Sequence, residues 1–456
     1  MKFDTLVIGG GQAGIPLAVA LVKAGQTVAL AERKYLGGSC VNFGCTPTKA
    51  VIASARLAHD ARRAVDYGLK IPEVEVDFAA VLERAKTILL DSRDSLQDKF
   101  EGDDALTLLR GHARLTGKGD DGFQITVGDE QVTAARVVLN TGTRSLIPQV
   151  EGLEALDFIH SGNWLEHATL PEHLIILGGG YIGLEMSQFY RRMGARVTVV
   201  ESGAQVAAHE DEDVAAKLQE VLEAEDIVFE LGAKAKKVSR EGGVTLTFER
   251  DGQEGSVQGS HLFVATGRKP NTDDLGLETV SVETDDKGII EVDERLATNV
   301  EGIWVAGDIR GGPMFTHTAY DDYRVLESQL VGDGSHTTNR VVPYGMFVDP
   351  QLGRVGMTER EARDAGKTVQ VACYDMKSNG RAREEGRTGG FIKVVVDTEN
   401  DRLLGAAVIA AEGAEMVHTY ITLMNANVPY SVARDAVFVH PTYSEGIQSV
   451  LKKLSD

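Results

Sequence analysis

Two of the three cysteines, Cys40 and Cys45, lie five positions apart in a glycine-containing segment and are the residues best suited to chemistry. In a regular helix this spacing holds the two Cα atoms roughly 8–9 Å apart, beyond the usual range for a disulfide. The segment must therefore be distorted if the pair is to form a bridge, and Gly44 and Pro47 are residue types that permit or force distortion. A helix N-terminus at this point would lower the pKa of a thiolate, which favours dithiol exchange.

A redox role for the pair competes with two unrelated buried thiols and with a metal-binding pair. The sequence holds no C-x-x-C spacing and no histidine cluster with ligand spacing, so the redox role is favoured. Cys373 is interpreted as a buried small apolar residue, and the acidic run 209–213 as a solvated helix start. No resident metal ion is expected.

A glycine-rich turn near the start of the chain predicts a dinucleotide-binding unit. The first 32 residues show the pattern of a strand, a glycine turn, a helix and a second strand. Gly9 permits the tight turn, Gly11 lets the backbone approach a pyrophosphate, and Gly14 allows close packing of helix and strand. Glu32, at the end of the second strand, can accept hydrogen bonds from a ribose.

The same pattern recurs at Gly178, Gly180 and Gly183, followed by Glu201, and the repetition makes the signal strong. Gly9 to Glu32 and Gly178 to Glu201 both span 23 positions. Further along each copy, the sequence contains another apolar strand that ends in Thr-Gly. The residues expected at these strand ends are Thr141, Gly142 and Gly267. Two complete nucleotide-binding folds are therefore predicted.

The acidic end of the second motif favours NADH over NADPH. A carboxylate at Glu201 accepts from a free 2′-hydroxyl and repels a 2′-phosphate. Residues 202–205 supply no arginine or lysine that could hold that phosphate. A merely solvated glutamate at the strand end is the competing interpretation.

Composition sets further bounds on the function. The chain has 456 residues, 43% hydrophobic, and a formal net charge of −21, enough for about three domains. The acidic balance opposes binding to nucleic acid or to an anionic membrane. No apolar run is long enough to span a bilayer and no signal peptide is recognised, so a cytoplasmic enzyme is expected.

Three segments identify a family resemblance. Residues 37–49 read GGSCVNFGCTPTK, residues 298–308 read TNVEGIWVAGD and residues 440–445 read HPTYSE. With these motifs the chain resembles, over nearly its whole length, the pyridine nucleotide–disulfide oxidoreductases, the flavoprotein family of dihydrolipoamide dehydrogenase, glutathione reductase and mercuric reductase. The resemblance implies FAD as a bound cofactor and NADH as electron donor. Asp308 would hold the ribityl chain of the FAD.

The resemblance also assigns roles around the cysteines. Cys40 would be the interchange thiol that faces the substrate, and Cys45 would lie against the flavin. Lys49 would approach the flavin, paired with Glu185, and Tyr181 would gate the nicotinamide pocket. Electrons would pass from NADH to FAD, to the cysteine pair and on to the substrate.

A histidine near the carboxyl end completes the expected site. His440 is suited to acid–base work because it titrates near neutral pH, and Glu445 can hold its tautomer. In the family this histidine reaches the interchange cysteine of the other subunit, so the resemblance implies a homodimer. Taken alone, a histidine before proline is more often structural.

The expected fold is α/β, with two Rossmann-like dinucleotide-binding domains in a glutathione-reductase-like arrangement and an α+β C-terminal dimerisation domain. An FAD domain is placed at 1–145, with a helical excursion at about 50–110. An NAD domain follows at 146–268, a central FAD-contacting domain at 269–338 and the dimerisation domain at 339–456.

Departures from the best-known members narrow the substrate. Mercuric reductases carry a second cysteine pair near the C-terminus and commonly lack the histidine, whereas this sequence has no such pair and keeps His440. The NADPH-binding arginines of glutathione reductases are missing after Glu201. Dihydrolipoamide dehydrogenase remains an alternative, although Phe438 replaces its usual histidine. The stretch 315–324 looks more like the reactive-chlorine-resistance branch. A small disulfide or a soft metal ion is therefore the expected acceptor, and a redox sensor without turnover is the alternative of another class.

Overall fold

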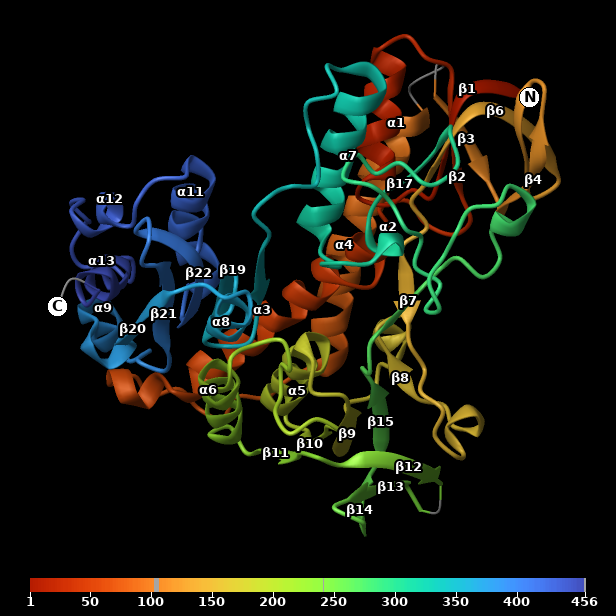
Figure 1. The fold of residues 1–456 in the computed structure, drawn as a ribbon. Coiled ribbons are helices and arrows are strands. Elements are labelled where there is room, and N and C mark those ends of the chain that lie inside the picture. Colours follow the sequence, from red (N-terminus) through yellow and green to blue (C-terminus); the bar gives the residue numbers. More distant parts are fainter. Residues whose placement is uncertain (102–105, 241, 455–456) are drawn as a thin grey trace.

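The chain is organised around three large sheets (Figure 1). They are built in order along the chain, except that one strand of the first sheet is supplied after the second sheet is complete. The computed structural model describes residues 1–101, 106–240 and 242–454. No helix among these residues is both long and apolar enough to cross a membrane.

The first sheet has the strand order β3-β2-β1-β6-β5-β4, and β17 pairs in parallel with β6. Its strands are β1 (Lys2–Ile8), β2 (Val28–Glu32), β3 (Leu106–Arg110), β4 (Ala113–Gly119), β5 (Gly122–Val127), β6 (Glu130–Leu139) and β17 (Ile303–Val305). Its helices are α1 (Gly14–Lys23), α2 (Gly38–Asn42), α3 (Cys45–Arg62), α4 (Phe78–Glu101) and α7 (Thr316–Val331). The segment expected to form a separate central domain thus contributes strand β17 to this sheet.

The apolar pattern of β1 explains why this sheet is covered on both faces. Leu6 and Ile8 pack into one core, whereas Val7 between them packs into another. A strand buried on both faces reads as a continuous apolar run, which is typical of parallel sheets. The expected helical excursion is present as α3 and α4.

The second sheet has the order β11-β10-β9-β15-β8 and is parallel throughout. Its strands are β8 (Ile159–His160), β9 (His173–Leu177), β10 (Arg196–Val200), β11 (Ile227–Glu230) and β15 (His261–Val264). Helices α5 (Tyr181–Met193) and α6 (Glu212–Glu223) accompany it. A small antiparallel sheet follows, with β12 (Lys234–Ser239), β13 (Val244–Arg250) and β14 (Gln253–Gly259), and β7 (Thr143–Ser145) pairs with β16 (Arg268–Pro270).

The third sheet is antiparallel, in the order β18-β19-β22-β21-β20. Its strands are β18 (Pro343–Met346), β19 (Gln351–Gly356), β20 (Val369–Asp375), β21 (Phe391–Asp397) and β22 (Arg402–Ala410). Its helices are α8 (Glu359–Asp364), α9 (Gly380–Glu384), α10 (Gly413–Met416), α11 (His418–Ala426), α12 (Ser431–Arg434) and α13 (Glu445–Lys452). The interpretation of Cys373 as buried is wrong: it is exposed, because alternation along edge strand β20 turns Ala372 inward and Cys373 outward.

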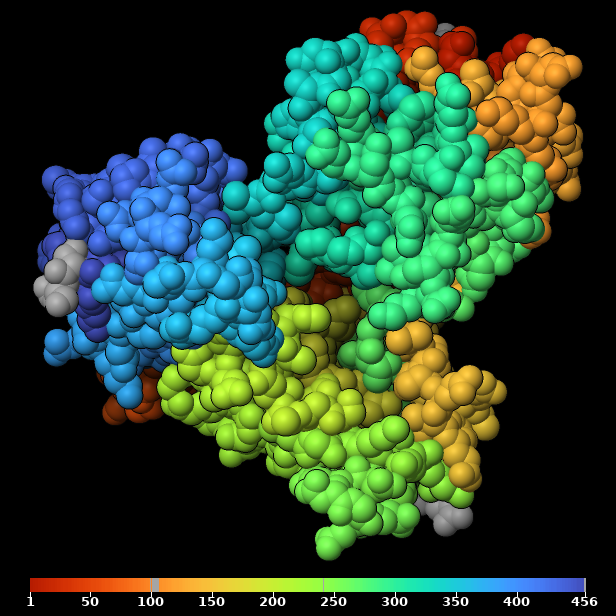
Figure 2. Space-filling model, viewed as in Figure 1, coloured from red at the N-terminus to blue at the C-terminus, as the bar shows by residue number. Residues whose placement is uncertain are grey.

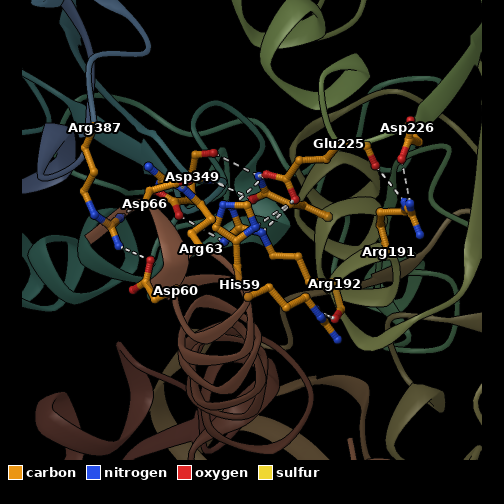
Figure 3. Close-up of polar contacts among 12 residues, drawn as sticks. His59, Asp60, Arg63, Asp66, Arg191, Arg192, Glu225, Asp226, Asp349 and Arg387 are labelled. Carbon is orange, nitrogen blue, oxygen red and sulfur yellow. Dashed lines mark hydrogen bonds and ion pairs between the residues drawn. The ribbon is translucent and has the colours of Figure 1, made fainter. Parts of the chain in front are cut away.

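An ionic network ties the three sheet units together around α3 and α5 (Figure 3). Arg192 of α5, 4% exposed, pairs with Glu225 at 2.7 Å and with Asp349 at 3.0 Å. Arg387 pairs with Asp349 and with Asp60 on α3. Buried charges need such partners, since an unpaired one is costly. The network therefore holds α3 and α5 in a defined relation to the third sheet.

Candidate active site

The two cysteines lie where a helix is interrupted. Helix α2 ends at Asn42, Phe43 and Gly44 leave the helical conformation, and α3 begins at Cys45. The predicted distortion is therefore present. Both cysteines are free thiols, so the structure describes the dithiol form of the pair.

The two thiols have opposite pKa shifts. Donation from Cys40 is the main cause that lowers the pKa of Cys45 to about 6, with further lowering by Thr316 and Lys49 against the opposing effect of burial. The same hydrogen bond, together with burial, raises the pKa of Cys40. Thr316 Oγ1 lies 3.2 Å from Cys45 Sγ. Cys45 is thus the thiolate of the pair near neutral pH.

The expected pairing of Lys49 with Glu185 is present. Lys49 follows Cys45 by one turn of α3, and its Nζ lies 2.7 Å from a carboxylate oxygen of Glu185 on α5. The backbone N–H of Phe347 donates to the same carboxylate at 2.8 Å, and the ammonium lies over the Phe347 ring. Three units of the chain therefore converge on one ion pair.

A cleft of about 2250 Å³ joins the dithiol to both glycine motifs. Figure 2 shows the molecule hollowed where the three units meet. Predicted site residues that line this cleft are Gly9, Gly11, Glu32, Cys40, Cys45, Lys49, Thr141, Gly142, Gly178, Gly180, Tyr181, Glu185, Glu201, Gly267 and Asp308. Gly14 and Gly183 lie behind the turns, where an added Cβ would meet a backbone oxygen at 2.1 Å.

The first glycine turn fits a dinucleotide. Gly9 has φ +110°, and an added Cβ there would lie 2.2 Å from the carbonyl oxygen of Asn140, so only glycine is accommodated. Asn140 is buried beside this turn, and its Nδ2 has no hydrogen-bond partner among the described residues. A buried unpaired donor that faces a cleft suits a polar ligand. The residues present therefore fit FAD.

The second turn repeats this geometry. Gly178 has φ +112°, and an added Cβ would lie 2.4 Å from the carbonyl oxygen of Ala265. The carboxylate of Glu201 accepts from the backbone N–H of Gly179 at 2.7 Å and of Gly203 at 2.6 Å. In the first turn, Glu32 accepts in the same way from Gly10 and Lys34. Each carboxylate thus supports its own turn and keeps lone pairs for a ribose.

The strand ends beside the turns are held by hydrogen bonds. Thr141 Oγ1 donates to the carbonyl of Asn271 at 2.9 Å, and Gly142 accepts from the Asn271 backbone. Asp308, three residues after the end of β17, accepts from Thr143 Oγ1 at 3.0 Å.

Tyr181 belongs to a stack of aromatic rings that sequence reasoning did not find. Its ring lies 5.6 Å from Tyr344 and 6.4 Å from Phe315, between centroids. The hydroxyls of both tyrosines donate to one oxygen of Glu210 at 2.8 Å. Glu210 is fully buried and pairs with Arg354. The interpretation of 209–213 as a solvated helix start is therefore wrong at Glu210, because distant tyrosines and an arginine cover it.

The structure does not bring His440 to the cysteines within one chain. His440 is outside the cleft, with its side chain 76% exposed, and its Nδ1 lies 3.0 Å from Glu445 at the start of α13. The backbone N–H of Thr442 is the main cause that lowers the pKa of Glu445. Val437 and Val439 beside it are 99% and 76% exposed.

Comparisons with known proteins cover almost the whole chain. Residues 3–322 match the family model of pyridine nucleotide-disulphide oxidoreductase, and residues 342–451 match its dimerisation domain. The chain is 32% identical over 454 residues to the probable pyridine nucleotide-disulfide oxidoreductase RclA of Escherichia coli (strain K12), with 98% of each covered. It is also 32% identical over 458 residues to a dihydrolipoyl dehydrogenase of Cupriavidus necator, with 97% of this chain and 96% of that protein covered.

Solved structures agree with this match. The Cu(II) complex of the HOCl-induced flavoprotein disulfide reductase RclA from Escherichia coli aligns with a TM-score of 0.89 at 30% identity, with 99% of each chain covered. The expected α/β fold, with its two Rossmann-like units and a C-terminal dimerisation domain, is confirmed. The chain therefore belongs to the pyridine nucleotide–disulfide oxidoreductase family and is one of its FAD- and NAD(P)H-dependent flavoenzymes.

Proposed function

We propose that this enzyme oxidises NADH and delivers the electrons through Cys40 and Cys45 to a small disulfide or a soft metal ion. The observation that carries the proposal is a dithiol with one thiol of depressed pKa, in a cleft lined by both nucleotide motifs. FAD, when bound, supplies the acceptor for the hydride of NADH and returns an electron pair to the disulfide.

The chain's own residues account for the thiol half of the reaction. Because the pKa of Cys40 is raised, a base must first take its proton. Cys40 then attacks a sulfur of the substrate disulfide, forming one S–S bond while the first substrate thiolate leaves. Cys45 then attacks Cys40, which releases the second substrate thiolate and closes the Cys40–Cys45 disulfide. Lys49 and Glu185 fix the charge beside this pair. Residues of the glycine turns, the Thr-Gly strand ends and Asp308 are proposed to hold the two nucleotides.

We propose that His440 of the partner subunit exchanges the protons of this step in a homodimer. Two observations support this proposal: the His440 side chain is exposed, and so are Val437 and Val439 beside it. Within one chain these apolar side chains are uncovered, and a partner subunit would cover them. Mixed dimers of Cys40→Ser and His440→Ala test the proposal. If the site is shared between subunits, the mixed dimer regains one intact site of two, whereas a site within one chain would stay inactive.

A soft metal ion is a candidate acceptor because thiolates suit soft cations. RclA of Escherichia coli has been solved as a Cu(II) complex, and we infer that cupric ion is an acceptor here as well. Among the described residues, no group of three or more His, Cys, Asp and Glu could hold a metal ion. In this proposal the metal ion is a substrate that the cysteine pair reduces.

Dihydrolipoamide dehydrogenase activity is the second candidate, supported by the 32% identity to the Cupriavidus necator enzyme. Phe438, where that enzyme class usually has a histidine, weighs against it. A redox sensor without turnover is the third candidate. The second nucleotide motif argues against it, because a sensor needs no hydride donor.

An acceptor panel decides between these functions. NADH oxidation is measured with lipoamide, glutathione disulfide, cupric ion, mercuric ion, quinone and oxygen. Cys40→Ser should abolish disulfide and metal reduction, while Cys373→Ser, which changes an exposed cysteine on β20, serves as the matched control. If no acceptor loses rate with Cys40→Ser, the thiol route is wrong. Cytoplasmic location stays a prediction, to be tested by fractionation.

A further inference from the structure

Thr316 lies beside the redox cysteine pair. It is the first residue of α7, and its hydroxyl oxygen lies 3.2 Å from Cys45 Sγ. The hydroxyl also lowers the pKa of the Cys40 thiol, against the larger raising effects of Cys45 and of burial. A threonine hydroxyl has one donor hydrogen that rotates freely. It can therefore donate to one of the two sulfurs at a time.

Two helix N-termini meet at this point. Cys45 begins α3, of 18 residues, and Thr316 begins α7, of 16 residues. Helix N-termini favour negative charge within the first turn, and the first turn of each helix, as the structure describes it, contains no acidic residue. The charged groups that act on Cys45 are Lys49, which favours the thiolate, and Glu185, which opposes it. The two helix N-termini therefore favour a negative charge on the sulfur that lies between them.

We propose that Thr316 is a catalytic residue of the thiol exchange, whose hydroxyl donates to the Cys45 thiolate and turns to Cys40 when the negative charge lies there. The inference rests on the proposed thiol route. Thr316 gains and loses no proton in either exchange step. In the first step the negative charge passes from Cys40 to the first substrate thiolate, and in the second it passes from Cys45 to the second substrate thiolate. In each step one S–S bond forms and one breaks, and the hydroxyl donates to whichever of the two cysteines carries the charge before it attacks.

The proposal has a consequence for the reducing power of the pair. A donor that stabilises the thiolate stabilises the reduced dithiol, so its removal makes the pair a stronger reductant. If the thiolate becomes tenfold less stable, the reduction potential of this two-electron couple falls by about 30 mV.

The test compares Thr316→Val, which has nearly the same shape without a hydroxyl, with Thr316→Ser, which keeps it. Enzyme reduced by a chemical dithiol is titrated across pH, and the long-wavelength absorbance that the Cys45 thiolate produces beside the flavin reports the ionisation of Cys45. This readout needs neither NADH nor an acceptor. We expect the midpoint for Cys45 in Thr316→Val to rise by about one pH unit from about 6, with Thr316→Ser close to the unchanged protein.

Unchanged midpoints in Thr316→Val and in Thr316→Ala would overturn the proposal. A midpoint that rises equally in Thr316→Ser would also overturn it, because the hydroxyl would then not be the cause. A failure of the thiol route itself would be recognised in a different experiment, the acceptor panel, in which Cys40→Ser would leave the rate with every acceptor unchanged. Retained FAD content and thermal unfolding show that each variant is folded.

Discussion

The carboxylate of Glu201 should determine the choice between NADH and NADPH. Two unit charges about 4 Å apart repel by about 4 kcal/mol at an effective dielectric constant of about 20. Because Glu201 is only half-buried, solvent reduces this figure. We therefore expect NADH to be favoured at least tenfold in kcat/KM, a difference of about 1.4 kcal/mol.

The hydrogen bonds of Glu201 separate its charge from its structural role. Glu201→Gln removes the charge but keeps an oxygen that can accept from Gly179 or Gly203. This variant should narrow the NADH preference mainly by improved use of NADPH. Glu201→Ala leaves both N–H groups without that acceptor, at about 1–3 kcal/mol for each that stays unsatisfied. Glu201→Ala should therefore also lower kcat/KM for NADH.

The assay is steady-state reduction of one acceptor with either coenzyme. Glu32→Gln is the matched control, because Glu32 supports the first glycine turn through the same pair of backbone contacts. It should weaken FAD retention and leave the ratio of NADH to NADPH unchanged. Equal use of both coenzymes by the unchanged enzyme, or an unchanged ratio in Glu201→Gln, would refute the reasoning.

Three further outcomes are expected. Two-electron reduction should produce long-wavelength absorbance from the Cys45 thiolate. Cys45→Ser should abolish this absorbance and Cys40→Ser should retain it. The opposite pattern in a spectral titration would mean that Cys40, and not Cys45, is the thiol beside the flavin. Because the pKa of Cys45 is lowered to about 6, this absorbance should be fully developed above pH 7 and be lost as pH falls through 6, whereas an ordinary thiol ionises near pH 8.5. Arg192→Met should lower the free energy of unfolding by about 3–5 kcal/mol, since it removes the arginine partner of the largely buried Glu225 and leaves Asp349 with Arg387 alone. Arg196→Met, in an exposed pair, should cost under about 1 kcal/mol. Similar urea midpoints for the two variants would contradict this.

Local sequence patterns predicted the two nucleotide units because their signals are short in range. The turns that begin at Gly9 and Gly178 each place their glycines at a fixed spacing between one strand and one helix, so spacing alone reveals them. The break before Cys45 was likewise predictable from Gly44. The carbonyls that crowd Gly9 and Gly178 come from distant residues, Asn140 and Ala265, and were not predictable from that spacing.

Contacts between distant segments escaped sequence reasoning. Glu210 lies in an acidic run, and only the fold brings Tyr181 and Tyr344 onto its carboxylate. Thr316 is 271 positions from Cys45. Neither partnership follows a helical or strand period, so no local pattern signals it.

Helix α3 begins at Cys45 and ends at Arg62, and just after its end Arg63 and Tyr67 donate to the backbone carbonyls of Gly386 and Glu385 in one loop. At about 1.5 Å per residue its 18 residues extend about 27 Å. A helix of this length behaves as a stiff rod, so a small rotation at the loop displaces the sulfur at the opposite end. Substitutions in that loop are therefore expected to alter thiol reactivity without changing any residue of the cleft.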